Sequence, residues 1–381
     1  MTKCFHLGIA AFFLLVGVSP LPIRAEEPGP SAPRGALQTA AFLPFTGSAA
    51  EQGEWIRAGL ELGRDKALSA LGVSIEIQYE DTVADPKTAM SAYQGLRSRD
   101  DFKIAFSYGS GVGIALTAPV NRDKVIQIGL ATASPAYRTP DDYTFRNFPS
   151  AELESAFLVS KTLNDLHGKE IGIVKIDNDF GVGAAKSFRA EYEKQGGRVL
   201  FEESIEPGST DFKSLVTRLR QYNARYIYIA AYPSEGAQFL KQARQLGMSA
   251  QFIASVAILG AKNFQDLAGS GAEGLLISTS TPVFLASKEP SVIEFVNQYR
   301  EKFHEEPGIQ HIFAARAYDA MLLSAHAFKA CGKADTDCMR EYLFQTRNFI
   351  GASGTLSFDR NGDVSNTFSL QQVRNGRLEG Y

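Results

Sequence analysis

The sequence predicts an α/β fold in which two parallel sheets follow one another along the chain, each covered by helices on both faces. Two observations support this prediction. Short β-type runs alternate with amphipathic helical runs from residue 36 onward, which is the order that parallel sheets with crossover helices require. The same alternation begins again after residue 150, and 381 residues are enough for two domains of ordinary size.

Hydrophobic spacing defines the elements of the first run. The segment 73–79 alternates apolar and polar side chains strictly, which is typical of a strand. Pro86 opens a helix at a favoured position, and Asp85 is its expected N-cap. The predicted strands are 36–43, 73–79, 103–107 and 125–128, and the predicted helices are 51–71, one that begins at residue 86, and 110–121.

The second run has the same rhythm and a different ending. Gly196 and Gly197 mark the end of one of its helices. Near the C-terminus, the turn-forming segment 359–363 predicts a hairpin of strands 355–358 and 367–373. The other predicted strands are 171–176, 198–203, 226–230, 251–255 and 274–280, and the predicted helices are 151–166, 180–195, 212–222, 234–246, 291–303, 309–330 and 337–346.

The first 25 residues have the three-part pattern of a secretory signal. Lys3 supplies the positive start, an uncharged and mostly apolar run of 12 residues extends from Leu7 to Val18, and Ala25 is a small residue at the expected cleavage site. The alternative is a membrane anchor, which needs about 20 apolar residues. We expect residues 1–25 to be removed on export, residues 26–35 to form a flexible lead-in, and the mature chain not to insert into a membrane.

Composition excludes several classes of protein. The chain has 39 basic and 42 acidic residues, and such an even balance argues against a nucleic-acid partner. Three cysteines are too few for a disulfide-rich scaffold. After export, Cys331 and Cys338 remain and form either a disulfide between two helices or two free thiols. The five histidines show no metal-ligand spacing, so we expect neither a metal nor a cofactor.

A glycine-rich loop after a predicted strand is the strongest candidate binding feature. In the segment 108–113, Ile114 stands where a dinucleotide fingerprint needs its third glycine, and the flanks do not match a nucleophile elbow. Ser110 and Gly111 instead predict a loop that binds a carboxylate or another small anion at a helix N-terminus. The alternative is a plain strand-to-helix turn.

Two further strand ends carry candidate residues. Ala131, Thr132 and Ala133 follow the next strand and suit the backbone-lined wall of a pocket, or else form an ordinary loop. Asp179 follows the strand 171–176, where a helix cap is expected and a calcium loop is not, because the distal glutamate is missing. No spacing of catalytic residues supports an enzyme, and we expect none.

Several motifs together resemble the type I periplasmic binding proteins of ABC importers, and most closely the leucine/isoleucine/valine-binding family. The resemblance covers essentially the whole chain after the signal. It is carried by these segments: 43–47 with Gly53, Ser110–Gly111, 131–135, 143–146, 179–181, 207–212, 268–274, 318–320 and 354–359 with Gly362.

The resemblance implies two Rossmann-like lobes joined by a three-crossover hinge that closes around a ligand. Lobe one would comprise 36–150 plus 283–350, and lobe two 151–282 plus 351–381. A monomer of this kind would present its closed form to the membrane permease of an ABC importer. A periplasmic sensor of the same fold is the alternative, and an enzyme on this scaffold is a third class.

The resemblance also implies the site residues. Ser110, Gly111 and the backbone of Ala131 and Ala133 would hold the ligand's carboxylate. The side walls would come from Gln52, Phe180 and Tyr232.

Two departures from the family's pattern bear on the ligand. Alanine occupies position 133, with Thr132 beside it, where a hydroxyl residue is usual. Val256 or Ala257 stands where a glutamate usually holds the amino group. Because a desolvated ammonium without a counter-charge is costly, we expect an organic or aromatic acid, an amide, an amino-acid-like molecule or a neutral solute instead of a simple α-amino acid.

Overall fold

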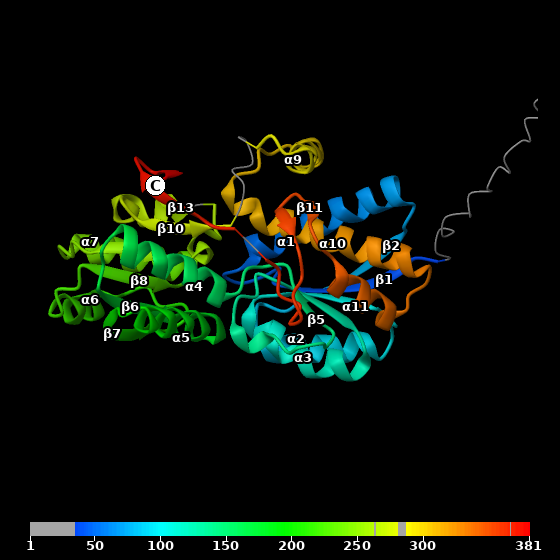
Figure 1. The fold of residues 1–381 in the computed structure, drawn as a ribbon, viewed down its shortest axis with the longest axis horizontal. Helices are drawn as coiled ribbons and strands as arrows, with labels where there is room; N and C mark the ends of the chain where they lie inside the picture. The colour runs from blue at the N-terminus through cyan, green and yellow to red at the C-terminus, as the bar shows by residue number, and fades with distance from the viewer. Residues whose placement is uncertain (1–34, 263, 281–286, 366) are drawn as a thin grey trace, which may run out of the picture. The chain divides into compact units, whose positions relative to one another are not determined.

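The computed structural model describes residues 35–262, 264–280, 287–365 and 367–381 (Figure 1). The predicted signal and nearly all of the lead-in therefore lie outside the described residues. Among the residues that the structure describes, no helix combines the length and apolarity that crossing a bilayer requires.

The first sheet is entirely parallel, with the strand order β2-β1-β3-β4-β5. Helices α1 and α10 pack against each other, as do α2 and α3. The elements are β1 (Leu37–Leu43), α1 (Ala50–Lys66), β2 (Ile75–Asp81), α2 (Pro86–Arg97), β3 (Ile104–Tyr108), α3 (Ser110–Asp123), β4 (Ile126–Leu130), β5 (Thr144–Arg146) and α10 (Ile312–Cys331).

Strand β1 shows why this sheet is buried on both faces. Ala40 and Phe42 join a core cluster with residues of α2 and α3. Ala41 and Leu43, which point to the opposite face, join the larger core with residues of α1 and α10. A strand covered on both faces needs no polar side, which explains why residues 40–43 at its carboxyl end are all apolar.

The second sheet is mixed, with the order β14-β13-β10-β9-β8-β6-β7. Five strands are parallel, and the two from the C-terminus are antiparallel. Its elements are α4 (Ala151–Ser160), β6 (Glu170–Ile176), α5 (Asp179–Lys194), β7 (Arg198–Ile205), α6 (Lys213–Arg220), β8 (Tyr226–Ala230), α7 (Pro233–Gln245), β9 (Gln251–Ala254), α8 (Phe264–Ala268), β10 (Leu276–Thr279), β13 (Ser369–Arg374) and β14 (Arg377–Gly380).

The C-terminal hairpin differs from the prediction. The 359–363 turn closes only an isolated antiparallel bridge between Phe358 and Val364. The real hairpin is β13–β14, and its turn is Asn375–Gly376, where both residues have positive φ. This two-residue turn is a standard hairpin signal that the sequence prediction overlooked. A second short hairpin pairs β11 (Phe349–Gly351) with β12 (Gly354–Leu356).

Three passages of the chain connect elements of the two sheets, and their described residues are 147–150 for the first, 280 with 287–289 for the second, and 346–365 with 367–368 for the third. The third passage touches the first sheet on its way, because the N–H of Arg146 donates to the carbonyl of Gly362 at 2.9 Å. The predicted lobe boundary at residue 351 stays a prediction, and these contacts associate 360–363 with strand β5.

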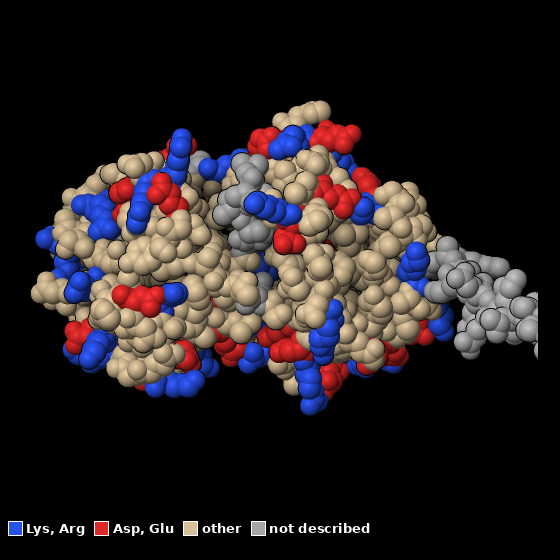
Figure 2. Space-filling view, turned by 45° about the horizontal axis from the view of Figure 1, so that its top comes forward, with Lys and Arg blue, Asp and Glu red and all other residues tan. Residues whose placement is uncertain are grey.

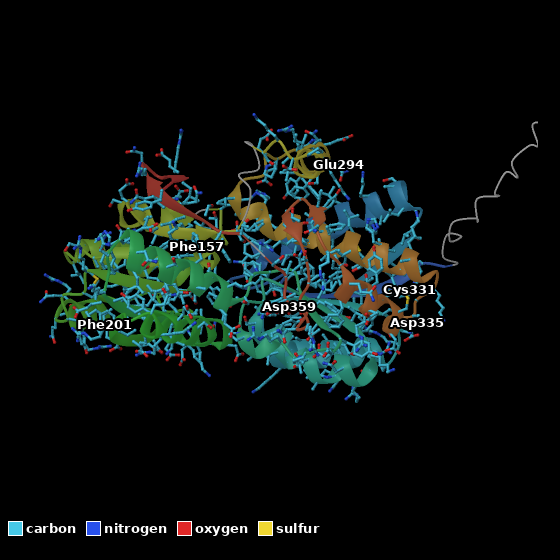
Figure 3. The ribbon with its side chains drawn as sticks, viewed as in Figure 1. Phe157, Phe201, Glu294, Cys331, Asp335 and Asp359 are labelled. Atoms are coloured by element: carbon cyan, nitrogen blue, oxygen red, sulfur yellow. A yellow bond between two sulfur atoms is a disulfide. The ribbon has the colours of Figure 1, made fainter. Side chains whose placement is uncertain are left out.

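Helices α9 (Pro290–Phe303) and α11 (Thr336–Gln345) complete the described fold. Cys331, at the end of α10, is joined to Cys338 of α11 by a disulfide, and Figure 3 labels Cys331 beside Asp335, the N-cap of α11. Figure 2 shows basic and acidic side chains interspersed over one face of the molecule.

Candidate functional site

The predicted binding residues lie in the loops and first helical turns that follow the carboxyl ends of parallel strands, where open α/β sheets bind ligands. Ser110 and Gly111 begin α3 directly after β3 and Gly109. Gly109 has φ +77°, a left-handed conformation that favours glycine and turns the chain sharply into the helix. The first-turn N–H groups of α3 have no partner within the helix and remain available to an acceptor.

The hydroxyl of Ser110 connects two of these loops. Its Oγ accepts hydrogen bonds from the N–H groups of Ala133 at 3.3 Å and Ser134 at 3.1 Å. Ser110 is 1% exposed. Because the oxygen accepts in both contacts, the hydroxyl proton is still available for an anion or another acceptor.

The side chain of Thr132 holds two loops together. Its Oγ1 donates to the carbonyl of Gly109 at 3.1 Å, so the hydroxyl fastens one loop to the other. Its neighbour Ala131 has φ +58°, an uncommon conformation for a residue with a side chain. Ala133 is buried and contributes its backbone, as its N–H bond to Ser110 shows.

A buried ion pair stabilises the loop after β4 through a hydrogen bond to its backbone. The guanidinium of Arg146 binds the carboxylate of Asp363 through two contacts, Nε to Oδ1 at 2.6 Å and Nη2 to Oδ2 at 2.9 Å. Nη1 of Arg146 donates to the carbonyl of Ser134 at 2.9 Å. Sequence reasoning placed Arg146 only in a family motif and took Asp363 for a turn residue, because 217 residues separate the partners.

A hydrogen-bonded chain links loops of the two sheets at Gln52. Its amide Nε2 donates to the carbonyl of Gly260 at 2.8 Å, and the hydroxyl of Tyr108 donates to its Oε1. Burial raises the pKa of Tyr108 well above its ordinary value, with the hydroxyl of Tyr232 as a smaller cause, so Tyr108 is a donor at neutral pH. The side chain of Tyr108 was missed because it ends a strand in which every residue is buried.

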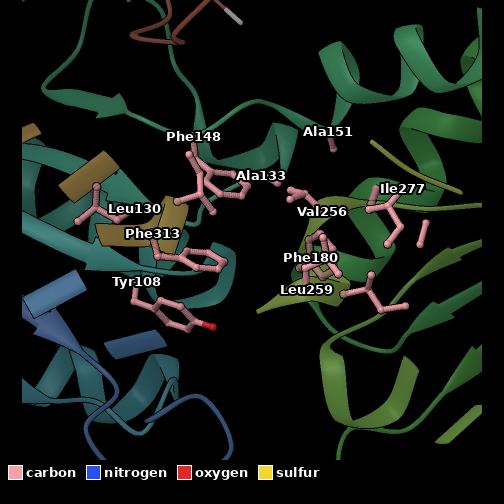
Figure 4. Packing of buried hydrophobic residues seen from close by; sticks show 14 of the residues in the cluster. Tyr108, Leu130, Ala133, Phe148, Ala151, Phe180, Val256, Leu259, Ile277 and Phe313 are labelled. Carbon is pink, nitrogen blue, oxygen red and sulfur yellow. The ribbon is translucent and has the colours of Figure 1, made fainter. Parts of the chain in front are cut away.

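Aromatic residues dominate the remaining walls. Phe180 and Tyr232 stack with ring centroids 5.2 Å apart and an interplanar angle of 13°. From the first sheet's side, Phe313 stacks on Phe148 at 6.1 Å. Figure 4 shows Phe148, Phe313 and Tyr108 on one side and Phe180, Val256 and Leu259 on the other, directed toward the space between them.

A cavity of about 240 Å³ lies beside this cluster. Gln52, Tyr108 and Tyr232 line it, together with Glu51 and Glu235. The carboxylate of Glu235 is buried and accepts a hydrogen bond from the N–H of Gly208 at 2.8 Å. Ser110, Ala133, Phe180 and Val256 do not line it.

A buried carboxyl group lies next to the position where the family's glutamate is absent. The N–H of Val256 donates to Oε1 of Glu154 at 3.1 Å, and the hydroxyl of Ser278 donates to the same oxygen. Burial raises the pKa of Glu154, and its two donors oppose the shift. Sequence analysis missed Glu154 because it belongs to α4, about 100 residues before Val256.

Known proteins resemble this chain over nearly its whole described length. The family described as "Periplasmic binding protein" matches residues 37–377. The leucine-, isoleucine-, valine-, threonine- and alanine-binding protein of Pseudomonas aeruginosa is 24% identical over 328 residues, covering 85% of this chain and 86% of that protein.

Two solved structures show the same fold. A leucine-binding protein from Thermotoga maritima has a TM-score of 0.84 at 25% identity and covers 91% of this chain and 98% of its own. A solute-binding protein of an ABC transporter from R. palustris, solved in complex with benzoate, has a TM-score of 0.78 at 18% identity, with coverages of 91% and 95%. The predicted α/β architecture of two sheets in a type I periplasmic binding fold is thereby confirmed.

Proposed function

We propose that this chain, which belongs to the periplasmic binding protein family, captures a small organic or aromatic acid or an amide between its two sheets and delivers it to an ABC importer. Its relatives are substrate-binding proteins and not enzymes. Export through cleavage near Ala25 and docking on a membrane permease are parts of this proposal. The relatives' names favour transport over the alternative of a sensor.

One observation carries the proposal. Segments at the carboxyl ends of both sheets meet at Gln52, in the first turn of α1, which bonds to Tyr108 at the end of β3 and to Gly260 in the segment after β9. A molecule held there would touch both halves of the fold. Such a ligand stabilises the closed arrangement by its differential affinity for it.

The polar groups on the first sheet's side favour an acceptor on the ligand. The first-turn N–H groups of α3 and the hydroxyl proton of Ser110 are donors, and a helix N-terminus contributes about 0.3–2 kcal/mol toward an anion. That is too little for capture at micromolar affinity, about −8 kcal/mol, so most of the binding free energy must come from apolar contact. The stack of Phe180 on Tyr232 supplies such a surface.

The ammonium of an α-amino acid has no evident partner at positions 256 and 257. Glu154 approaches Val256, but its Oε1 already accepts from two donors, and burial raises its pKa, so its negative charge is disfavoured. We therefore propose a ligand without a free ammonium group. The fold itself accommodates both classes, since similar proteins are named for leucine and for benzoate.

Mass spectrometry of the ligand released from the purified protein, followed by a thermal-shift screen, tests this proposal. The screen uses benzoate and related acids, amides, leucine and valine. A true ligand at 100 times its Kd adds about 2.7 kcal/mol to the free energy of unfolding. We expect an acid or an amide to do so, and leucine and valine to add nothing.

A matched pair of variants shows whether the ligand sits at the proposed loop. Ser110→Ala removes the hydroxyl proton, and we expect it to weaken binding at least tenfold. Thr132→Val removes a hydroxyl from the same loops that is bonded to Gly109, and we expect affinity within threefold of wild type. Tight leucine binding would overturn the ligand class. A protein that carries no ligand and responds to no compound would overturn capture itself.

A further inference from the structure

Helix α10 carries two buried charged residues that the binding site does not use. Arg316 is 1% exposed and Asp319 is 0% exposed. They lie three residues apart, so both project from neighbouring positions on one face of the helix. Each is engaged by a passage between the two sheets.

Arg316 binds the first two passages. Its Nη1 donates to the carbonyl of Asn147 at 3.2 Å, in the first passage, and its Nη2 donates to Oγ of Ser280 at 2.7 Å, where the second begins. The amide of Asn147 returns a bond to the carbonyl of Arg316 at 2.8 Å. The guanidinium also lies over the ring of Phe148, 5.3 Å from its centroid.

Asp319 binds the third passage. Its carboxylate accepts from the N–H groups of Ala352 and Ser353, both at 2.7 Å, and from the hydroxyl of Ser353 at 2.6 Å. A Cβ at Gly351 would lie 2.3 Å from the carboxylate, so only glycine allows this approach. The carboxylate thus holds the turn between β11 and β12.

Helix α10 packs closely against α1, which belongs to the first sheet's side of the molecule. A Cβ at Gly59 of α1 would lie 2.0 Å from the carbonyl oxygen of Ala314, so the two helix backbones are nearly in contact. The anchor of all three passages is therefore a helix that cannot shift without disturbing α1. Removing either charge would leave groups in the interior without their partners, which is strongly destabilising.

We propose that Arg316 and Asp319 make α10 the common anchor of the three passages, so that the passages are held and released together as one hinge. The two residues are positioning residues: Arg316 acts through the carbonyl of Asn147 and the hydroxyl of Ser280, and Asp319 acts through the N–H and hydroxyl of Ser353. The proposal adds to the function proposed above and does not depend on any ligand.

Hydrogen exchange of the ligand-free protein tests the coupling. In Asp319→Asn, local loss of the carboxylate accelerates exchange at Ala352 and Ser353. The coupling further predicts at least tenfold faster exchange in peptides that cover Asn147 and Ser280, which Asp319 does not touch. Ser324→Ala is the matched control, because this buried hydroxyl of α10 donates to the carbonyl of Ala320, within its own helix.

Milder variants keep the test decisive where Asp319→Asn does not fold. Ser353→Ala removes one donor of the third passage, and Asn147→Ala removes one of the first. We expect the shift in urea midpoint of the double variant to differ from the sum of the shifts of the two single variants, although the two residues belong to different passages. Additive midpoints, or exchange changes confined to residues 351–355, would overturn the common anchor. Neither outcome would bear on ligand capture.

Discussion

The two sides of the candidate site are built in contrasting ways. On the first sheet's side, Ser110, Thr132 and Arg146 hold two loops through specific hydrogen bonds to backbone groups. On the second sheet's side, Phe180 and Tyr232 form an aromatic stack. Fixed hydrogen-bond donors can bind a polar group that many ligands share, whereas an apolar wall favours ligands whose apolar part fits it. We therefore expect the first sheet's side to bind the carboxylate or amide group of the ligand, and the second sheet's side to contact the rest of the molecule.

Breaking the support of the polar side should have the largest effect. Arg146→Ala leaves Asp363 as a buried carboxylate without its principal partner, and loss of one member of such a pair costs about 3–5 kcal/mol. Urea unfolding measures this loss. Arg138→Ala is the control, because this half-buried arginine contacts the same carboxylate at 3.4 Å and should cost less than about 1 kcal/mol. Equal losses in the two variants would contradict the assigned role of Arg146.

The hinge between the two sides should respond to pH. Burial raises the pKa of Asp319 from 3.8 to about 6, and its three donors and the charge of Arg316 only partly oppose this. The folded protein therefore binds this proton more tightly than the unfolded chain does. The resulting stabilisation is complete below about pH 3.8 and is lost as the pH rises through about 6.

Comparison with Asp319→Asn isolates that contribution. Relative to the variant, the wild type should lose about 2–3 kcal/mol of unfolding free energy between pH 4 and pH 7, since each pKa unit corresponds to about 1.4 kcal/mol. Parallel stability curves for the two proteins across this range would show that Asp319 does not titrate as described.

A new carboxylate beside the aromatic stack should change which ligands the second sheet's side prefers, with a smaller effect than the changes above. Ala257 is half-buried after β9, so Ala257→Glu places a carboxylate there with less desolvation than at the buried Val256. We expect leucine to bind at least tenfold more tightly than to wild type, which corresponds to about 1.4 kcal/mol. Calorimetry measures this, with Ala257→Gln as the uncharged control. A gain in the Gln variant as large as in the Glu variant would exclude a charge effect.

Sequence reasoning predicted most features that depend on local pattern, but the cap of α5 expected at Asp179 is Asn178, whose side chain accepts from the N–H of Gly181. The alternation of 73–79 led to β2, Asp85 caps α2 through the N–H of Thr88, and Ser110 lies at the start of α3. It missed the short strand β5 and helix α8, which are too short to show a period. It also chose the 359–363 turn over Asn375–Gly376, although both carry turn-forming residues.

The rest of the site depends on pairs that are distant in the chain. Glu154 and Val256 are 102 residues apart, and Gln52 and Gly260 are 208 apart. The residues next to a buried glutamate or a strand-ending tyrosine in the sequence do not indicate which distant residue will be its hydrogen-bond partner. The contact exists only because two sheets bring their strand ends together.

By itself, the sequence determined the α/β class, the order of the elements and the helix starts at which Ser110 and Phe180 lie, because periodicity and helix-start signals act over a few residues. Only the tertiary structure decided that the hydroxyl of Thr132 donates to the carbonyl of Gly109, that Asp363 forms an ion pair with Arg146, and that α10 forms hydrogen bonds with all three passages. The physical reason is that a buried polar group must find a partner wherever the fold supplies one, and that partner can come from any part of the chain.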